Sequence, residues 1–275
     1  MPARESHFVT IHGRTIYLEV DGHGPHMVMT HGLGASSNVF QPLTELFADR
    51  FTVVRFDWPG LGMSPLGSGH PPLTIPIYER VLEGVLNHLH IDQAVLIGHS
   101  LGGIASMHFA AHHPTRVTAL ATIGAGRTRA SPSQGRTETL GIAESARKHG
   151  IWPTVDHRVH WNIIPHSPAL ARALLRQVTA STDPEGYAQM CDALTDSSHV
   201  DPDYSKISCP TVVIGGWHDT IAPVEVTNDL YTLIKAGPAI VHLVLLETGH
   251  MQIIEDVGGV AGSIEGILQV ATNHR

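Results

Sequence analysis

One pentapeptide, Gly98-His99-Ser100-Leu101-Gly102, constrains the possible fold more than any other feature, because of where it lies in the chain. The apolar run 94–97 before it is typical of a buried strand, and the residues after it are typical of a helix. A strand-to-helix elbow lifts its serine to the edge of a sheet, and the flanking glycines avoid collisions with the neighbouring strand and helix. The context predicts an α/β fold that presents a nucleophilic serine.

Strand and helix signals alternate along the chain on both sides of this elbow. Helical spacing of apolar residues is found at 38–48, 75–89, 101–112 and again near 260–268. Gly13-Arg14 separates the first two strands as a hairpin turn. The predicted strands lie at 7–12, 15–20, 27–30, 51–56, 94–97, 117–123, 211–214 and 240–246. This alternation predicts a mostly parallel sheet flanked by helices.

The strand signal disappears between Arg127 and Ser208, where residues 137–148 and 170–178 show helical spacing instead. We interpret residues 127–208 as a helical cap domain inserted into a core domain formed by residues 1–126 and 209–275. With 275 residues and 42% hydrophobic content, the chain is long enough for one catalytic domain and such a cap.

Composition excludes several classes of partner. The formal net charge is -8 and basic clusters are missing, which argues against binding of nucleic acid. No stretch reaches the roughly 18–20 apolar residues of a membrane span, and the first residues lack the apolar core of a secretion signal, so we expect a cytoplasmic protein. With only Cys191 and Cys209, a disulfide scaffold is not expected. A small-molecule substrate is favoured.

Three residues are candidates for a catalytic triad. In this sheet topology the acid and the histidine follow the serine along the chain, each on a loop after the carboxyl end of a strand. Asp219 follows the strand that ends at Ile214, and His250 follows the strand that ends at Leu246. Asp219 would fix the tautomer of His250 through one imidazole nitrogen, and the other nitrogen would take the proton of Ser100.

Each of these residues also has a structural interpretation. Ser100 could cap the helix that follows it, and Asp219 could cap a helix that starts near Pro223. Glu247 is the nearest alternative acid, but a side chain so close to His250 on the same strand end would point elsewhere. The occurrence of serine, acid and histidine in order at three separate strand ends favours the triad.

Backbone N–H groups near the serine would complete the catalytic machinery as an oxyanion hole. One N–H belongs to Leu101, directly after the nucleophile, and the other to Leu33 in the glycine-containing loop after the third strand. His31 in that loop is interpreted as structural, as is His99. Asp57 precedes the serine in the chain, so we interpret it as a brace for its own loop.

Neither a metal nor a cofactor is expected. His112 and His113 are adjacent on a predicted helix and cannot converge on one ion, and the other histidines are scattered. The glycines at 98–103 do not form a dinucleotide-binding fingerprint. A cofactor-free site without a metal is the simpler interpretation.

Taken together, the motifs resemble those of the α/β-hydrolase superfamily over essentially the whole chain, and in particular the small capped esterases and lactonases of the 3-oxoadipate enol-lactonase type. The resemblance implies an eight-stranded sheet, a helical cap over the pocket, and hydrolysis through an acyl-enzyme. The chain departs from those proteins after the histidine, where Glu255 is followed by Asp256-Val257 and not by proline. The motifs are His31-Gly32, residues 57–64, Gly98 to Gly103, Gly216-Trp217-His218-Asp219 with Pro223, and Gly249-His250-Met251.

A hydrolase of a small carboxylic ester or lactone is the favoured function. Serine as nucleophile argues against the dehalogenases and epoxide hydrolases of this fold, which use aspartate there. C–C bond hydrolases and cofactor-free haloperoxidases use the same triad, and a ligand receptor with a hydrolase fold stays open. Pocket candidates are Trp161 and Met190 in the cap, with Trp217 and Met251 beside the triad. The sequence gives no indication of the oligomeric state.

Overall fold

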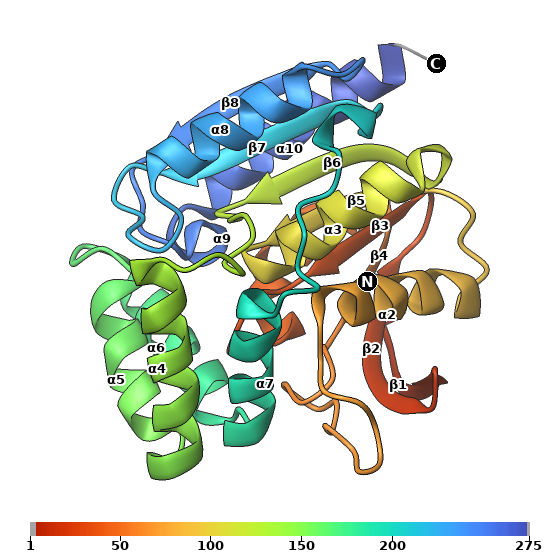
Figure 1. The fold of residues 1–275 in the computed structure, drawn as a ribbon. Coiled ribbons are helices and arrows are strands. Elements are labelled where there is room, and N and C mark those ends of the chain that lie inside the picture. The colour runs from red at the N-terminus through yellow and green to blue at the C-terminus, as the bar shows by residue number, and fades with distance from the viewer. Residues whose placement is uncertain (1–3, 274–275) are drawn as a thin grey trace.

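Eight strands form one sheet in the computed structural model, which describes residues 4–273 (Figure 1). Their spatial order is β1-β2-β4-β3-β5-β6-β7-β8; the pairs that involve β2 are antiparallel and all other pairs are parallel. The predicted eight-stranded, mostly parallel sheet is therefore confirmed. The strands are β1 (Arg4–Ile11), β2 (Arg14–Gly22), β3 (His26–Thr30), β4 (Thr52–Phe56), β5 (Ala94–His99), β6 (Val117–Ile123), β7 (Thr211–Gly216) and β8 (Val241–Leu246).

The hairpin between β1 and β2 turns one residue earlier than the sequence predicts. Ile11 pairs with Arg14, so the turn consists of His12 and Gly13, both with positive φ (49° and 79°). A two-residue hairpin of this kind needs positive φ at both turn positions. Arg14 belongs to the strand instead, where it is buried and donates hydrogen bonds to two backbone carbonyl oxygens.

Side chains of the central strands alternate between two hydrophobic cores, one on each face of the sheet. In β5, Leu96 packs on one face, whereas Val95 and Ile97 pack on the other. Strands covered on both faces need apolar residues at successive positions, which explains the apolar runs in the sequence. The first face is covered by α2 (Ile75–His88), α3 (Leu101–His112) and α8 (Val224–Lys235), and the second by α1 (Gln41–Phe47) and α10 (Val257–Asn273) (Figure 1).

The helix predicted at 38–48 is divided into a 3₁₀ turn, η1 (Ser37–Phe40), and α1. Pro42 lies in the first turn of α1, and proline has no N–H with which to continue a helix from the preceding turn. The helices predicted at 75–89 and 101–112 are observed as α2 and α3 with the same bounds to within one residue. The remaining short elements are η2 (Pro114–Arg116), η3 (Tyr204–Lys206) and α9 (Gln252–Glu255).

Four helices lie between β6 and β7 in the chain and form a group at one side of the sheet (Figure 1). They are α4 (Gln134–His149), α5 (Trp152–Trp161), α6 (Ala169–Ala180) and α7 (Pro184–Thr195). α4, α5 and α7 share a small apolar core that includes Ala146, Val155 and Tyr187. Among residues 4–273, no helix has the length and apolarity needed to cross a membrane.

Candidate active site

Ser100 occupies a strained turn between β5 and α3. Its backbone has φ 54° and ψ -119°, a conformation that costs a non-glycine residue about 1–3 kcal/mol and persists only when the surroundings enforce it. The N–H of Ser100 donates to the carbonyl oxygen of Ile123, 2.8 Å away at the end of β6. The elbow therefore holds the serine side chain at the carboxyl edge of the sheet.

Glycines make this elbow possible because neighbouring backbone lies where a side chain would start. A Cβ on Gly98 would come within 2.6 Å of the Gly102 carbonyl oxygen, and one on Gly102 would lie 2.1 Å from the Thr30 carbonyl oxygen. The prediction that a side chain at either glycine would collide with the neighbouring strand or helix is thus confirmed. Gly32, in the loop after β3, is equally constrained, because its Cβ would lie 2.7 Å from Ser100 Cβ.

Ser100, His250 and Asp219 are brought together by a chain of hydrogen bonds. His250 Nε2 lies 3.0 Å from Ser100 Oγ, and His250 Nδ1 lies 2.8 Å from Asp219 Oδ2. The side chains of His250 and Asp219 are almost fully buried. The three predicted residues come from the ends of β5, β7 and β8, as the order of motifs in the sequence indicates.

Asp219 is held as a carboxylate by its surroundings. Its Oδ1 accepts hydrogen bonds from the backbone N–H groups of Ile221 and Ala222, at 2.8 and 2.9 Å. Burial acts to raise the pKa of Asp219, but His250 and these N–H donors outweigh it, so the pKa is lowered. Glu247, the alternative acid, is an exposed side chain that contacts His218 on the surface.

His99 anchors the backbone of His250. Its Nε2 donates a hydrogen bond to the His250 carbonyl oxygen at 2.7 Å. Burial, with a smaller effect of His250, lowers the pKa of His99 to about 3, so its ring is neutral. Its structural interpretation is thereby supported, although the ring also borders the cavity described below.

Glu255 ties the loop of His250 to the segment between α5 and α6. Its Oε1 accepts from the backbone N–H of Met251 at 3.0 Å, and its Oε2 accepts from that of Gly249 at 3.2 Å. The same Oε2 accepts from the N–H of Ile164 at 2.9 Å and from Ser167 Oγ at 2.7 Å. One carboxylate thus joins two segments that are far apart in the sequence.

The loops after β3 and β4 brace each other, as expected for Asp57 and His31. Asp57 accepts hydrogen bonds from the backbone N–H groups of Ser37 and Met63, at 2.7 and 2.8 Å. His31 Nε2 accepts from the backbone N–H of Trp58, and burial lowers the pKa of His31. These hydrogen bonds give both side chains a structural role in the two loops.

A cavity of about 90 Å³ adjoins Ser100 and His250. Leu33 and Leu101, the predicted oxyanion-hole residues, both lie on its wall. A wider recess of about 360 Å³ next to it, between α4 and α5, shares wall residues with it, including Arg129. A compact substrate could therefore reach the serine from the side of the inserted helices.

The cavity wall carries three arginines and no aspartate or glutamate. Arg127 is paired with Asp201, whereas Arg129 and Arg158 have no carboxylate within 4 Å among the residues that the structure describes. Arg129 donates to Thr139 Oγ1 and to the Ile221 carbonyl oxygen. Formal positive charge therefore predominates among the residues that line the cavity, whereas Glu138 lines the recess beside it.

Arg158 is buried and links α5 to the loop after β3. It donates hydrogen bonds to the Gly34 carbonyl oxygen and to Thr179 Oγ1, and burial lowers its pKa. Arg158 is not among the site residues predicted from the sequence. A signal was present, because Arg158 lies three residues after Val155, on the buried face of a helix where an unpartnered charge is unusual.

The four predicted pocket residues are not on the cavity wall. Trp161 and Trp217 are exposed at the surface, at 54% and 52%. Met190 is fully buried in the core that α3 shares with α7, and Met251 is buried against Arg158 Nη2. Proximity in sequence to Asp219 or His250 does not fix side-chain direction, and helical spacing does not distinguish core from pocket, which explains why the four residues lie away from this wall.

Comparison with known proteins agrees with this architecture. Residues 25–145 match the family described as the alpha/beta hydrolase fold. The chain is 28% identical over 253 residues to 3-oxoadipate enol-lactonase 2 of Acinetobacter baylyi, covering 89% of each protein. It is 27% identical over 221 residues to a pimeloyl-[acyl-carrier protein] methyl ester esterase of Chromobacterium violaceum, covering 76% of this chain and 82% of the esterase.

The crystal structure of the enol-lactonase from Burkholderia xenovorans superposes on this chain with a TM-score of 0.86. The two are 25% identical, and the match covers 96% of this chain and 100% of the enol-lactonase chain. The protein therefore has the α/β-hydrolase fold, and its similarity to named hydrolases over most of its length indicates a hydrolytic enzyme. Among known proteins it is similar to enol-lactonases and small esterases.

Proposed function

We propose that the enzyme hydrolyses a carboxylic ester or lactone of a small molecule, with Ser100 as nucleophile. The observation that carries this proposal is the hydrogen-bonded chain from Asp219 through His250 to Ser100 Oγ, at the wall of a cavity. Similarity to an enol-lactonase and to a methyl ester esterase supports the same class of reaction.

Each triad member has a distinct role in the proposed reaction. Ser100 Oγ attacks the carbonyl carbon while His250 Nε2 accepts the hydroxyl proton, and Asp219 stabilises the resulting imidazolium. His250 then gives this proton to the leaving alkoxide oxygen as its C–O bond breaks, which leaves an acyl-enzyme. Water attacks the acyl group with His250 as base, and the acid leaves as Ser100 regains its proton.

The backbone N–H groups of Leu33 and Leu101 form the oxyanion hole in this proposal. Both residues border the cavity, and Leu101 opens α3, where N–H groups lack partners within the helix. Gly32 permits the loop after β3 to approach Ser100 closely. Donors fixed before the reaction stabilise the developing oxyanion without reorganising.

The charge of the wall supports a substrate with a carboxylate in addition to the scissile group. A guanidinium without a counter-ion is costly to bury, and a bound carboxylate would offset this cost at Arg129 or Arg158. Arg129 uses two of its five N–H donors in the hydrogen bonds to Thr139 and Ile221, so donors are left for a ligand.

Residues 127–208 act as a cap that determines substrate choice. They supply half of the residues that line the cavity, including the three arginines, His157, Asn162 and Tyr187. The His250 N–H donates to the Asn162 carbonyl oxygen at 2.8 Å, so the cap also contacts the triad loop directly. Residues 1–126 and 209–275 form the catalytic core in this division.

A screen of p-nitrophenyl esters of graded acyl length, together with aliphatic and aromatic lactones, tests the proposal. We expect multiple turnovers on at least one ester or lactone, and a loss of roughly 10³-fold or more in kcat for Ser100→Ala. Retention of more than a tenth of kcat by that folded variant would contradict it. Turnover confined to C–C cleavage or halogenation, or binding without turnover, would instead favour one of the alternative functions.

A further inference from the structure

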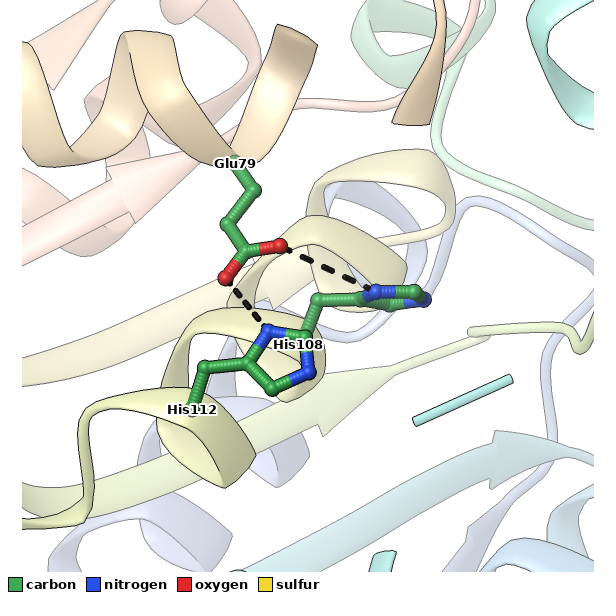
Figure 2. Close-up of side chains that lie close together, drawn as sticks. All are labelled: Glu79, His108 and His112. Carbon is green, nitrogen blue, oxygen red and sulfur yellow. Dashed lines mark hydrogen bonds and ion pairs between the residues drawn. The ribbon is translucent and has the colours of Figure 1, made fainter. Parts of the chain in front are cut away.

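Two histidines on α3 and a glutamate on α2 direct their polar atoms toward one point (Figure 2). His112 Nδ1 lies 2.7 Å from Glu79 Oε1, and His108 Nδ1 lies 3.9 Å from Glu79 Oε2. The ligand atoms of all three residues lie within 4.8 Å of one another. We infer that Glu79, His108 and His112 form a binding site for a divalent transition-metal ion, with Zn²⁺ as the ion that suits them best.

The spacing of the histidines explains how the site arises. His108 and His112 are four residues apart, so they lie one turn apart on the same face of α3. His113, next in the chain, also approaches Glu79, with Nε2 3.9 Å from Oε1, but it is not among the three residues whose ligand atoms all lie within 4.8 Å of one another. Glu79 enters the site because α2 packs against α3, which the sequence alone does not show.

The donor set matches the coordination chemistry of zinc. Two imidazole nitrogens and one carboxylate oxygen are zinc ligands, whereas Mg²⁺ and Ca²⁺ prefer oxygen donors throughout. Bonds of about 2.0–2.1 Å place tetrahedral donor atoms roughly 3.4 Å apart. The observed separations of 2.7 and 3.9 Å lie on either side of that value. Water would take the fourth position.

Packing fixes two of the ligands and leaves the third adjustable. The side chains of Glu79 and His108 are 13% and 6% exposed, whereas that of His112 is 51% exposed and gives the ion access from solvent. Nε2 of His108 is buried without a hydrogen-bond partner among residues 4–273. The rings of His108 and His199 are neighbours, with centroids 5.9 Å apart. Nδ1 of His199 donates to the Leu194 carbonyl oxygen.

The ion would link α2 to α3 and would take no part in the ester chemistry. His108 and His112 lie roughly 10–17 Å along the helix from Leu101, too far to contact atoms that react at Ser100. An ion that binds only the folded chain stabilises the folded state by mass action. The inference therefore does not depend on the proposed function.

Calorimetric titration of the EDTA-treated full chain with Zn²⁺ tests the site, with Glu79→Gln and His112→Asn as variants. The control is His88→Asn, which alters an exposed histidine on α2. We expect one Zn²⁺ per chain, a rise in Tm of roughly 5 °C at a hundredfold excess over Kd, and at least about tenfold weaker binding in both variants. The control should bind like the wild type.

Substitution with Co²⁺ gives a second readout, because tetrahedral Co²⁺ absorbs strongly in the visible range. The absorption should be present in the wild type and in His88→Asn, and lost in Glu79→Gln and His112→Asn. Circular dichroism shows whether each variant is folded; His112 is exposed, so its replacement leaves the core intact. Failure to bind one Zn²⁺ per chain, or equal affinity in wild type and both variants, would overturn the inference.

Discussion

The two oxygens of Asp219 have different partners, and this difference determines what replacement by asparagine would do. Oδ1 accepts from two backbone N–H groups, whereas Oδ2 faces His250 Nδ1 and also accepts from Gln252 Nε2 at 3.2 Å. In Asp219→Asn the amide oxygen keeps the backbone donors and the amide NH₂ faces His250. The imidazole then carries its proton on Nε2, toward Ser100, where it cannot act as a base. We expect kcat for ester hydrolysis to fall roughly 10⁴-fold.

Glu247→Gln is the matched control. It removes the charge of the other acid near His250, and Glu247 contacts His218 rather than the His250 imidazole. Steady-state kinetics of both variants on the same ester measures the effect. Equal losses in the two variants, or a loss of less than tenfold in Asp219→Asn, would show that Asp219 does not fix the tautomer.

Arg129 provides a test of the proposed carboxylate on the substrate. In Arg129→Gln the neutral amide keeps a hydrogen-bond donor but removes the charge from the cavity wall. A charge-assisted contact is stronger than a neutral one, so we expect KM for an ester with a terminal carboxylate to rise at least about tenfold. KM for the uncharged ester of equal length should change less than twofold. Equal effects on both substrates would exclude Arg129 as the anion-binding group.

At the scale of elements, Glu255 joins α9 to the segment that follows α5, and its carboxylate accepts from four donors. Glu255→Gln replaces one accepting oxygen with an NH₂ group, so at least one of these donors loses its partner. We expect the free energy of unfolding to fall by about 1–3 kcal/mol and kcat to fall about tenfold, because the loop holding His250 loosens. Urea unfolding and kinetics check this, with the exposed Glu144→Gln as control.

Strands, helices and triad could be predicted because each leaves a local signal. Apolar runs mark β5 and β6, and Ser100, Asp219 and His250 each follow a predicted strand end. The cavity wall could not be predicted, because it depends on how the four inserted helices pack on the sheet. Arg158 reaches Gly34 across 124 positions of sequence, and no local pattern encodes such a contact.

At the scale of the whole molecule, the buried histidines make folding dependent on pH. Burial lowers the pKa of His99 to about 3 and that of His108 to about 4, and it also lowers the pKa values of His31 and His199. The unfolded chain binds protons at these histidines near pH 6.5, whereas the folded chain does not. The contribution of these histidines to stability is therefore complete above about pH 6.5 and declines as the pH falls below it.

His99 allows this dependence to be measured at a single group. Between pH 7 and pH 5 the unfolded state gains about 0.7 proton at His99 and the folded state gains almost none, so this residue alone lowers the free energy of unfolding by roughly 2 kcal/mol. In His99→Gln the amide N–H can still donate to the His250 carbonyl oxygen, but the titrating group is gone. Urea unfolding at both pH values, in EDTA, should show a loss about 2 kcal/mol smaller in this variant than in the wild type, whereas the exposed His88→Gln should keep the wild-type loss. An unchanged pH dependence in His99→Gln would mean that His99 is protonated in the folded protein or that its ring is not buried.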